Sequence, residues 1–203
     1  WAKNGQEAGT SNGSLRMEAI QIALIPKGDA APGSTATPYR KIQSLSDIPG
    51  ELVIKVNKQC NTVTIYKGTV AYKAMVCSTG AATPIGSFRL GEKYRWHNLF
   101  YNSWGQYCTR ITGHILFHSV PYYSPNARDL ETTEFNKLGT EASAGCIRLQ
   151  FADAKWISDN CPSGTRVIIY NDPNPGPLGK PTAPVIPVNQ TWDPTDNELY
   201  SLQ

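Results

Sequence analysis

The stretch Ser143-Ala144-Gly145-Cys146-Ile147-Arg148-Leu149 places a cysteine between a glycine and an alternating apolar segment. Ile147 and Leu149 alternate with Arg148, a pattern typical of a strand that begins at the cysteine and holds it rigidly. Gly145 allows a tight turn before the thiol and adds no side chain, so a carbonyl group could approach the amide N–H groups near Gly145 and Cys146. The stretch therefore predicts a nucleophilic thiol beside an oxyanion hole.

A base for this thiol is available upstream, in Phe117-His118-Ser119. His118 and Cys146 lie 28 positions apart (146 − 118), so only the fold can bring them together, as nucleophile–base pairs generally require. A thiol with a pKa of about 8.5 is only slightly ionised near neutral pH, so an efficient Cys146 needs a basic or cationic neighbour. We interpret His118 as that base, and an ion pair with its imidazolium would lower the pKa of the thiol.

Together the two segments resemble the active-site signature of the L,D-transpeptidases, the YkuD-like cysteine enzymes that cross-link bacterial peptidoglycan. The resemblance extends to Val76-Cys77-Ser78-Thr79-Gly80 and Thr83-Pro84-Ile85-Gly86-Ser87-Phe88, which are similar to the family's "STG…TPxGxF" hairpin. Downstream it runs through Asp153-Ala154-Lys155-Trp156 to Gly164-Thr165-Arg166-Val167, so it covers about residues 51–170. One departure is Ala144, which stands where many members carry a second histidine.

The resemblance implies a role for each site residue. Cys146 is the expected nucleophile, His118 its base and Gly145 part of the oxyanion hole. The backbone carbonyl of Ser119, rather than its hydroxyl, is expected to orient the imidazole. The expected substrate-binding residues are Tyr122, Ser143, Ala144 and Arg148. For Arg148, holding the active-site loop is the preferred interpretation and binding a substrate carboxylate is the alternative.

The family chemistry implied is acyl transfer through a thioester, without a cofactor. The thiol would attack the carbonyl of the diamino acid at position three of a donor tetrapeptide stem and expel the terminal D-Ala. The side-chain amine of an acceptor stem would then attack the thioester and form a 3-3 cross-link. If water attacks instead, the enzyme is an L,D-carboxypeptidase, and the sequence leaves both outcomes open. A covalent adduct with a carbapenem β-lactam is also expected.

Composition restricts the other possibilities. The 203 residues are 40% hydrophobic and 17% charged, which suits one good core plus an accessory segment. A net charge of +3 is too small to indicate nucleic-acid binding, and no apolar run of about 18 residues predicts a membrane span. The chain opens on Trp1 without an initiator methionine or a signal-peptide pattern, so we interpret it as part of a longer precursor, and we expect a monomer.

A metal site is not expected. The five cysteines are widely and irregularly spaced, unlike zinc ligands or a dense disulfide framework, and their odd number leaves at least one thiol unpaired. His114 and His118 have the spacing of the ends of H-x-x-x-H. On a strand, however, they would share one face about 13 Å apart, which is four steps of about 3.3 Å and too far for one zinc ion.

The chain divides into four parts. Residues 1–25 resemble the later half of a ChW repeat, a module of clostridial-type surface proteins, although a β-hairpin packed on the main domain is an alternative. A linker rich in proline and glycine is expected over residues 26–50, the catalytic domain over 51–170, and a Pro-rich extended tail over 171–203, with a disordered linker as its alternative. The ChW resemblance implies an extracellular position, in the cell wall or on the surface of a Gram-positive bacterium. A non-enzymatic wall-binding module would also explain the half-repeat.

Apolar alternation predicts a mainly β fold, a YkuD-like β-sandwich with one or two short helices. Strands are expected around Leu52–Val56, Val63–Ile65, Val70–Val76, Ser87–Leu90 and Thr165–Tyr170, and one helix over Ala152–Asn160. An aromatic segment before His118 is either a lid over the site or part of the core; it contains Tyr94, Trp96, Phe100, Tyr101, Trp104 and Tyr107.

Overall fold

The computed structural model describes residues 44–200 continuously, and before them only residue 2 and the segments 9–11, 24–27, 29–30, 32–33 and 39–41. The chain forms two compact units, Trp1–Pro49 and Gly50–Gln203. In the first, β1 (Gly9–Ser11) pairs in parallel with β2 (Tyr39–Lys41), and η1 (Leu45–Asp47) is a single 3-10 turn. Most of residues 1–25, for which the sequence left a β-hairpin as an alternative, lie outside the described residues.

The second unit contains a five-stranded sheet in the order β5-β4-β3-β11-β6. Its strands are β3 (Leu52–Asn57), β4 (Thr62–Lys67), β5 (Val70–Val76), β6 (Gly86–Arg89) and β11 (Arg166–Tyr170). The β3–β4 hairpin buries Ile54, Val56, Val63 and Ile65, the alternating apolar residues of the sequence. The final strand, β11, lies between β3, to which it is parallel, and β6, to which it is antiparallel.

The second sheet has four strands in the order β10-β9-β8-β7. They are β7 (Lys93–Asn98), β8 (Trp104–Thr112), β9 (Ile115–Ser119) and β10 (Ile147–Leu149), with a 3-10 turn, η2 (Phe100–Asn102), between β7 and β8. The strand pair β9–β10 is parallel and places His118 opposite Arg148. This register brings Cys146, which immediately precedes β10, beside the strand that carries His118.

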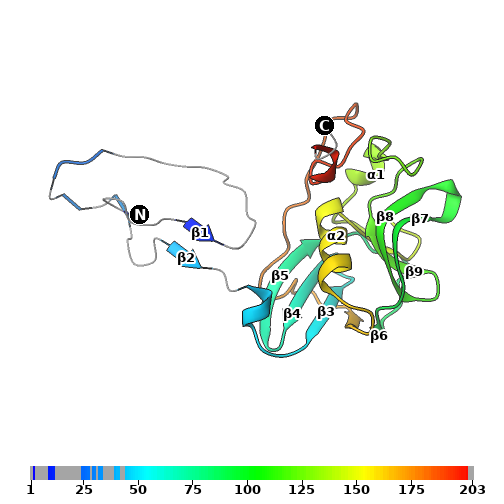
Figure 1. Cartoon of the computed structure of the whole chain (residues 1–203), viewed down its shortest axis with the longest axis horizontal. Helices are drawn as coiled ribbons and strands as arrows, with labels where there is room; N and C mark the ends of the chain where they lie inside the picture. The colour runs from blue at the N-terminus through cyan, green and yellow to red at the C-terminus, as the bar shows by residue number, and fades with distance from the viewer. Residues whose placement is uncertain are drawn as a thin grey trace. The chain divides into compact units, whose positions relative to one another are not determined.

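A shared core joins the two sheets to α2 (Phe151–Asn160). It combines Ile54 and Ile65 of the first sheet, Phe117 and Leu149 of the second, and Ile157 of the helix. In Figure 1, α2 is the yellow helix between the two sets of strands. A second helix, α1 (Thr132–Phe135), has a single turn. The mainly β sandwich and the helix near residues 152–160 are therefore confirmed.

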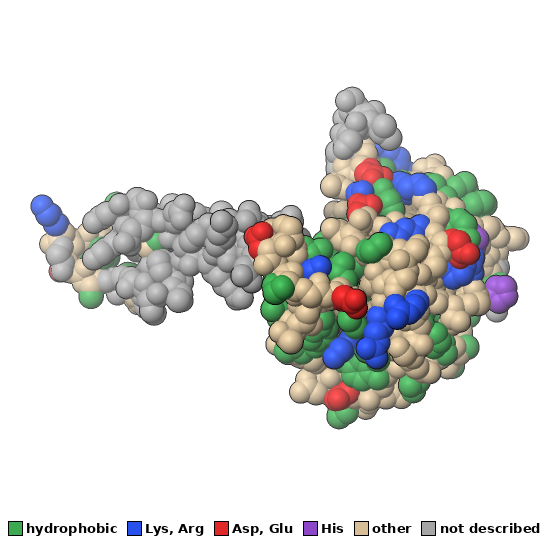
Figure 2. Space-filling view, turned by 60° about the horizontal axis from the view of Figure 1, so that its bottom comes forward, with side chains coloured by type: hydrophobic (Ala, Val, Ile, Leu, Met, Phe, Trp, Pro, Cys, Tyr) green, Lys and Arg blue, Asp and Glu red, His purple; other side chains and the backbone are tan. Residues whose placement is uncertain are grey.

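The last described segment, residues 171–200, runs extended across the unit and ends in the 3-10 turn η3 (Glu198–Tyr200). It caps α2 through residues 42 and 43 positions away in the sequence. Asp193 Oδ2 accepts the N–H of Phe151 at 2.8 Å, and Thr195 Oγ1 accepts the N–H of Ala152 at 3.1 Å. These are two of the four amide groups that the first turn of a helix leaves unpaired. On the face drawn in Figure 2, basic and acidic side chains are interspersed, in keeping with the small net charge.

Candidate active site

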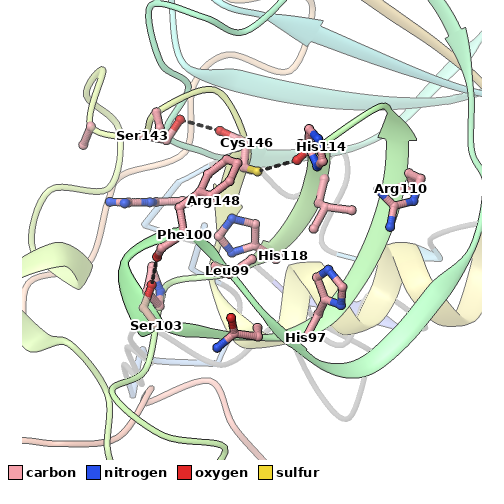
Figure 3. A pocket seen from close by; sticks show the side chains of 15 residues that line it. His97, Leu99, Phe100, Ser103, Arg110, His114, His118, Ser143, Cys146 and Arg148 are labelled. Carbon is pink, nitrogen blue, oxygen red and sulfur yellow. Dashed lines mark hydrogen bonds between the residues drawn. The ribbon is translucent and has the colours of Figure 1, made fainter.

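A pocket of about 450 Å³ lies along β9, and Cys146 and His118 both line it. Its walls include Leu116 and His118 of β9 and three neighbouring parts of the fold. The loop before β10 contributes Ser143, Ala144 and Cys146, and the β7–β8 hairpin contributes residues including His97, Phe100 and Arg110. The turn between β8 and β9 contributes His114. Figure 3 shows the Cys146 sulfur and the His118 ring facing the same cavity.

The Cys146 thiol is held at the pocket wall, where its Sγ donates a hydrogen bond to the backbone oxygen of His114 at 3.4 Å. Burial raises the pKa of the thiol. A backbone contact at Leu116 and the positive charges of Arg148 and Arg110 partly oppose that effect. The resting group is therefore a neutral thiol that needs a base in order to react.

The imidazole of His118 is buried and oriented by one backbone contact. Its Nδ1 lies 2.5 Å from the carbonyl oxygen of Ser119. Because a carbonyl oxygen only accepts, Nδ1 carries the hydrogen and Nε2 keeps its lone pair. The hydroxyl of Ser119 is occupied elsewhere, accepting from the N–H of Gln106 at 2.8 Å and donating to Val120 O at 2.9 Å. Of the two groups of Ser119, the carbonyl is the one that contacts the imidazole.

Burial lowers the pKa of His118 to about 3, and the nearby charge of Arg148 lowers it further. The hydrogen bond that the imidazole donates to the Ser119 carbonyl opposes both effects but is weaker than burial. The sequence led us to expect an imidazolium that lowers the pKa of the thiol. That expectation does not fit the structure, because desolvation disfavours the charged form of both groups. The pair rests as a neutral thiol and a neutral imidazole, in which His118 is suited to act as a general base.

The loop that carries Cys146 is held by residues 78–83. Thr83 Oγ1 accepts the N–H of Gly80 at 2.9 Å and donates to the carbonyl oxygen of Gly145 at 2.7 Å. Gly80 forms a bridge with Ser143, and a Cβ at Gly80 would lie only 2.0 Å from the Ser143 oxygen. Glycine and threonine at these two positions therefore fix the backbone just before Cys146.

Replacing Thr83 with valine should lower the free energy of unfolding by about 1–3 kcal/mol, because two buried backbone groups lose their partner. Thr109→Val is the matched control. Thr109 is equally buried, but its hydroxyl has no hydrogen-bond partner among the described residues, so its loss should be neutral or slightly stabilising. Urea unfolding of the two variants tests this. Equal stabilities would contradict the role given to Thr83.

Two of the predicted substrate-binding residues, Ser143 and Ala144, belong to the loop before β10. Ser143 Oγ donates to Cys146 O at 2.6 Å and accepts the N–H of Gly145 at 3.1 Å. The Gly145 amide is thus directed at a side chain of its own loop. Ala144 lines the pocket with a methyl group.

Arg148 is bound away from the thiol. Its Nη1 pairs with the carboxylate of Glu134 on α1, and its backbone N–H and carbonyl bond to Ser78, each at 2.9 Å. In Figure 3 its guanidinium points to the side opposite Arg110. These contacts favour the first of the two interpretations, in which Arg148 holds the active-site loop.

The prediction for Tyr122 is wrong. Its side chain is fully buried in a second cluster with Val120, Leu130 and Phe135, where its ring meets the edge of Trp96 at 5.2 Å. Backbone hydrogen bonds of 2.8 Å in both directions between Tyr122 and Trp104 turn the ring into that cluster. The preceding residue, Pro121, lines the pocket instead.

The aromatic segment divides between the two roles that were left open. Phe100, at the tip of the β7–β8 hairpin, lines the pocket, is 62% exposed and contacts the His114 ring at 5.9 Å. Trp96 and Trp104 pack on the second cluster, and Tyr107 lies in the main core. The sequence reasoning missed His97 and Arg110 on the same hairpin. Both lie within the aromatic segment or next to it, and the possibility that this segment forms a lid is the signal that could have identified them.

The described part of the chain shows no sign of metal chemistry or of a membrane-spanning helix. No group of three potential metal-ligating side chains occurs there, and no helix there is long and apolar enough to cross a membrane. All five cysteines are free. Burial raises the pKa of Cys77 and Cys108 strongly and that of Cys161 to about 12, so these thiols are poor nucleophiles.

Comparison with known sequences identifies the fold family. A model of the L,D-transpeptidase catalytic domain, YkuD, matches residues 51–169. The chain belongs to this L,D-transpeptidase family. Residues 1–26 match the model named clostridial hydrophobic W, ChW.

This chain is also similar to individual L,D-transpeptidases. The putative L,D-transpeptidase YciB of Bacillus subtilis (strain 168) is 35% identical over 131 residues, which are 57% of this chain and 64% of YciB. This chain thus spans less than two thirds of that relative. An L,D-transpeptidase from Mycobacterium smegmatis is 18% identical, with a TM-score of 0.49 over 65% of this chain and 61% of the other. L,D-transpeptidase 3 from Mycobacterium tuberculosis, in complex with a faropenem-derived adduct, is 18% identical, with a TM-score of 0.43 over 66% and 63%.

Proposed function

We propose that this chain is a peptidoglycan L,D-transpeptidase that forms 3-3 cross-links through a thioester on Cys146. One observation carries the proposal. Cys146 and His118 line one pocket, and the Ser119 carbonyl fixes the tautomer in which Nε2 of His118 can accept a proton. Membership of the YkuD family supplies the substrate class.

In the first half-reaction, His118 Nε2 takes the proton of the Cys146 thiol as the sulfur attacks the carbonyl carbon of the third stem residue. The carbonyl oxygen becomes an oxyanion, which the amide N–H of Cys146 would stabilise. Gly145 shares that role only if its amide leaves Ser143 Oγ. Collapse of the intermediate breaks the amide bond, and the imidazolium returns its proton to the departing amine of D-Ala.

In the second half-reaction, the side-chain amine of an acceptor stem attacks the thioester carbon. The amine proton passes to His118, the C–S bond breaks, and the thiolate is reprotonated as the new amide forms. Attack by water through the same steps releases a tripeptide, which is the L,D-carboxypeptidase alternative. Both reactions use the same thiol and base, and the acceptor present decides between them.

The two matched family models favour a cell-wall-associated enzyme. More specifically, the proposed enzyme acts outside a Gram-positive cell, as a monomer, on donor and acceptor stem peptides of the wall. A carbapenem would acylate Cys146 by opening its β-lactam ring, so that the whole drug mass is added to the protein. Neither nucleic acid nor a metal ion takes part in the proposed reaction.

The test combines the intact chain with a tetrapeptide donor, an acceptor stem and, separately, a carbapenem. Mass spectrometry should find a cross-linked dimer that has lost one D-Ala, and a protein adduct equal to the drug mass. Tripeptide without dimer would favour the carboxypeptidase. Folded protein that yields neither peptide product nor adduct would refute the proposal.

A further inference from the structure

The pocket around Cys146 has a cationic lining. Arg110 and Arg148 both line it, and none of the described residues in its wall is acidic. Figure 3 places the two arginines on opposite sides of Cys146. Both charges act on the thiol, since each lowers its pKa against the larger effect of burial. An anionic group on a substrate would therefore be attracted into this pocket.

The two arginines differ in how far they are neutralised. The partner of Arg148 is Glu134, a mostly buried carboxylate that also bonds Lys137. The partner of Arg110 is Glu92, at 2.9 Å, whose side chain is 66% exposed and lies outside the pocket wall. Water screens an exposed carboxylate much more than a buried one. Arg110 thus keeps more of its charge available to the pocket.

The guanidinium of Arg110 is held rigidly and still has free donors. Its Nε donates to Glu92, its Nη1 to the Gly113 carbonyl and its Nη2 to the Tyr94 hydroxyl at 3.2 Å. A guanidinium carries five N–H groups, so about two remain for a ligand. The contacts already fix the planar group, and binding a carboxylate therefore costs little additional side-chain entropy.

We propose that Arg110 determines donor specificity by binding a carboxylate of the acyl donor. This inference rests on the proposed function. A donor stem offers a carboxylate from two sources: the C-terminus of the leaving D-amino acid, and a carboxylate on the side chain of the diamino acid at position three. Amidation of the carboxylate that Arg110 binds removes the negative charge of that carboxylate and makes the peptide a poorer acyl donor. Amidation of the other carboxylate does not.

The first test needs no turnover. Iodoacetate and iodoacetamide both alkylate Cys146 by the same step, in which the thiolate sulfur bonds to the methylene carbon and iodide leaves. They have almost the same shape, but only iodoacetate is anionic. The ratio of their rates cancels any change in the thiol pKa or in its exposure. Peptide mapping restricts the measurement to Cys146, because Cys60 is also partly exposed.

Arg110→Gln should lower the iodoacetate-to-iodoacetamide ratio by about 10-fold or more, as expected for the loss of a charge-assisted hydrogen bond. Arg110→Lys, which keeps the charge without the planar fork, should give an intermediate ratio. Arg128→Gln is the matched control, because it removes one exposed positive charge outside this pocket and should leave the ratio unchanged. A wild-type ratio in Arg110→Gln would overturn the proposal.

The second test identifies the carboxylate. Tetrapeptide donors with neither group amidated, with the C-terminus amidated, or with the side-chain carboxylate amidated are compared by kcat/KM. In the wild type one of the two amides should be about 10-fold or more poorer than the free donor, and Arg110→Gln should abolish that difference. Equal use of all three donors by the wild type would also overturn the proposal. A lowered alkylation ratio without any turnover would instead refute the proposed function and leave the carboxylate site standing.

Discussion

Cys146→Ala should abolish both the carbapenem adduct and cross-link formation while leaving the fold intact. The sulfur is the atom that becomes acylated, and alanine offers no nucleophile in its place. The side chain is only partly buried, so the free energy of unfolding should change by less than about 1 kcal/mol. Intact-mass measurements after incubation with the drug, together with analysis of peptide products, read out both activities.

Cys77→Ala and Cys161→Ala are the matched controls, because each removes one thiol that is fully buried in the same unit. Desolvation raises the pKa of both thiols, so neither should be acylated in the folded protein. Both variants should therefore still form the adduct at Cys146. Turnover that survives in Cys146→Ala, or acylation lost in a folded control variant, would contradict the assignment of the nucleophile.

Much of the fold was predictable because its strands alternate apolar and polar residues. Ile54, Val56, Val63 and Ile65 show this pattern and are all buried in one hairpin. The short strand after Cys146 was predictable in the same way, since Ile147 and Leu149 are buried and Arg148 is not. Local periodicity, however, contains no information about which strands lie side by side. The parallel pairing of β9 with β10, which brings His118 toward Cys146, became visible only in the structure.

The errors at the site have a common physical cause. Tyr122 follows His118 closely in sequence, but backbone pairing with Trp104 turns it into a separate cluster. Arg110 and His97 are distant from the sequence motif, yet the β7–β8 hairpin folds over the thiol and brings both into the pocket. Side-chain direction there depends on tertiary pairing. The sequence also predicted a lowered pKa for the Cys146 thiol, whereas burial raises it. That error has the same origin, because burial is a property of the whole fold.

His118→Ala should slow acylation of Cys146 by about 10²–10⁴-fold, the usual contribution of a positioned general base. His114→Ala is the control. The backbone oxygen of His114, not its ring, contacts the thiol, and that oxygen remains after the substitution. Its acylation rate should stay close to that of the wild type. Both variants are first shown to be folded by their unfolding transitions.

The pH dependence distinguishes a base from a bystander more sharply than a single rate. In the wild type, His118 has a pKa of about 3, so its Nε2 can accept a proton throughout the neutral range. The rate should be nearly flat there and should fall only as the pH drops toward 3, where the imidazole gains the proton that blocks it. Without His118 the thiol must ionise unaided, and burial holds its pKa above the usual value. The rate of the variant should then rise about tenfold per pH unit below that pKa. Equal acylation rates for the wild type and His118→Ala, both independent of pH, would leave Cys146 without its base. The mechanism would then need another proton acceptor.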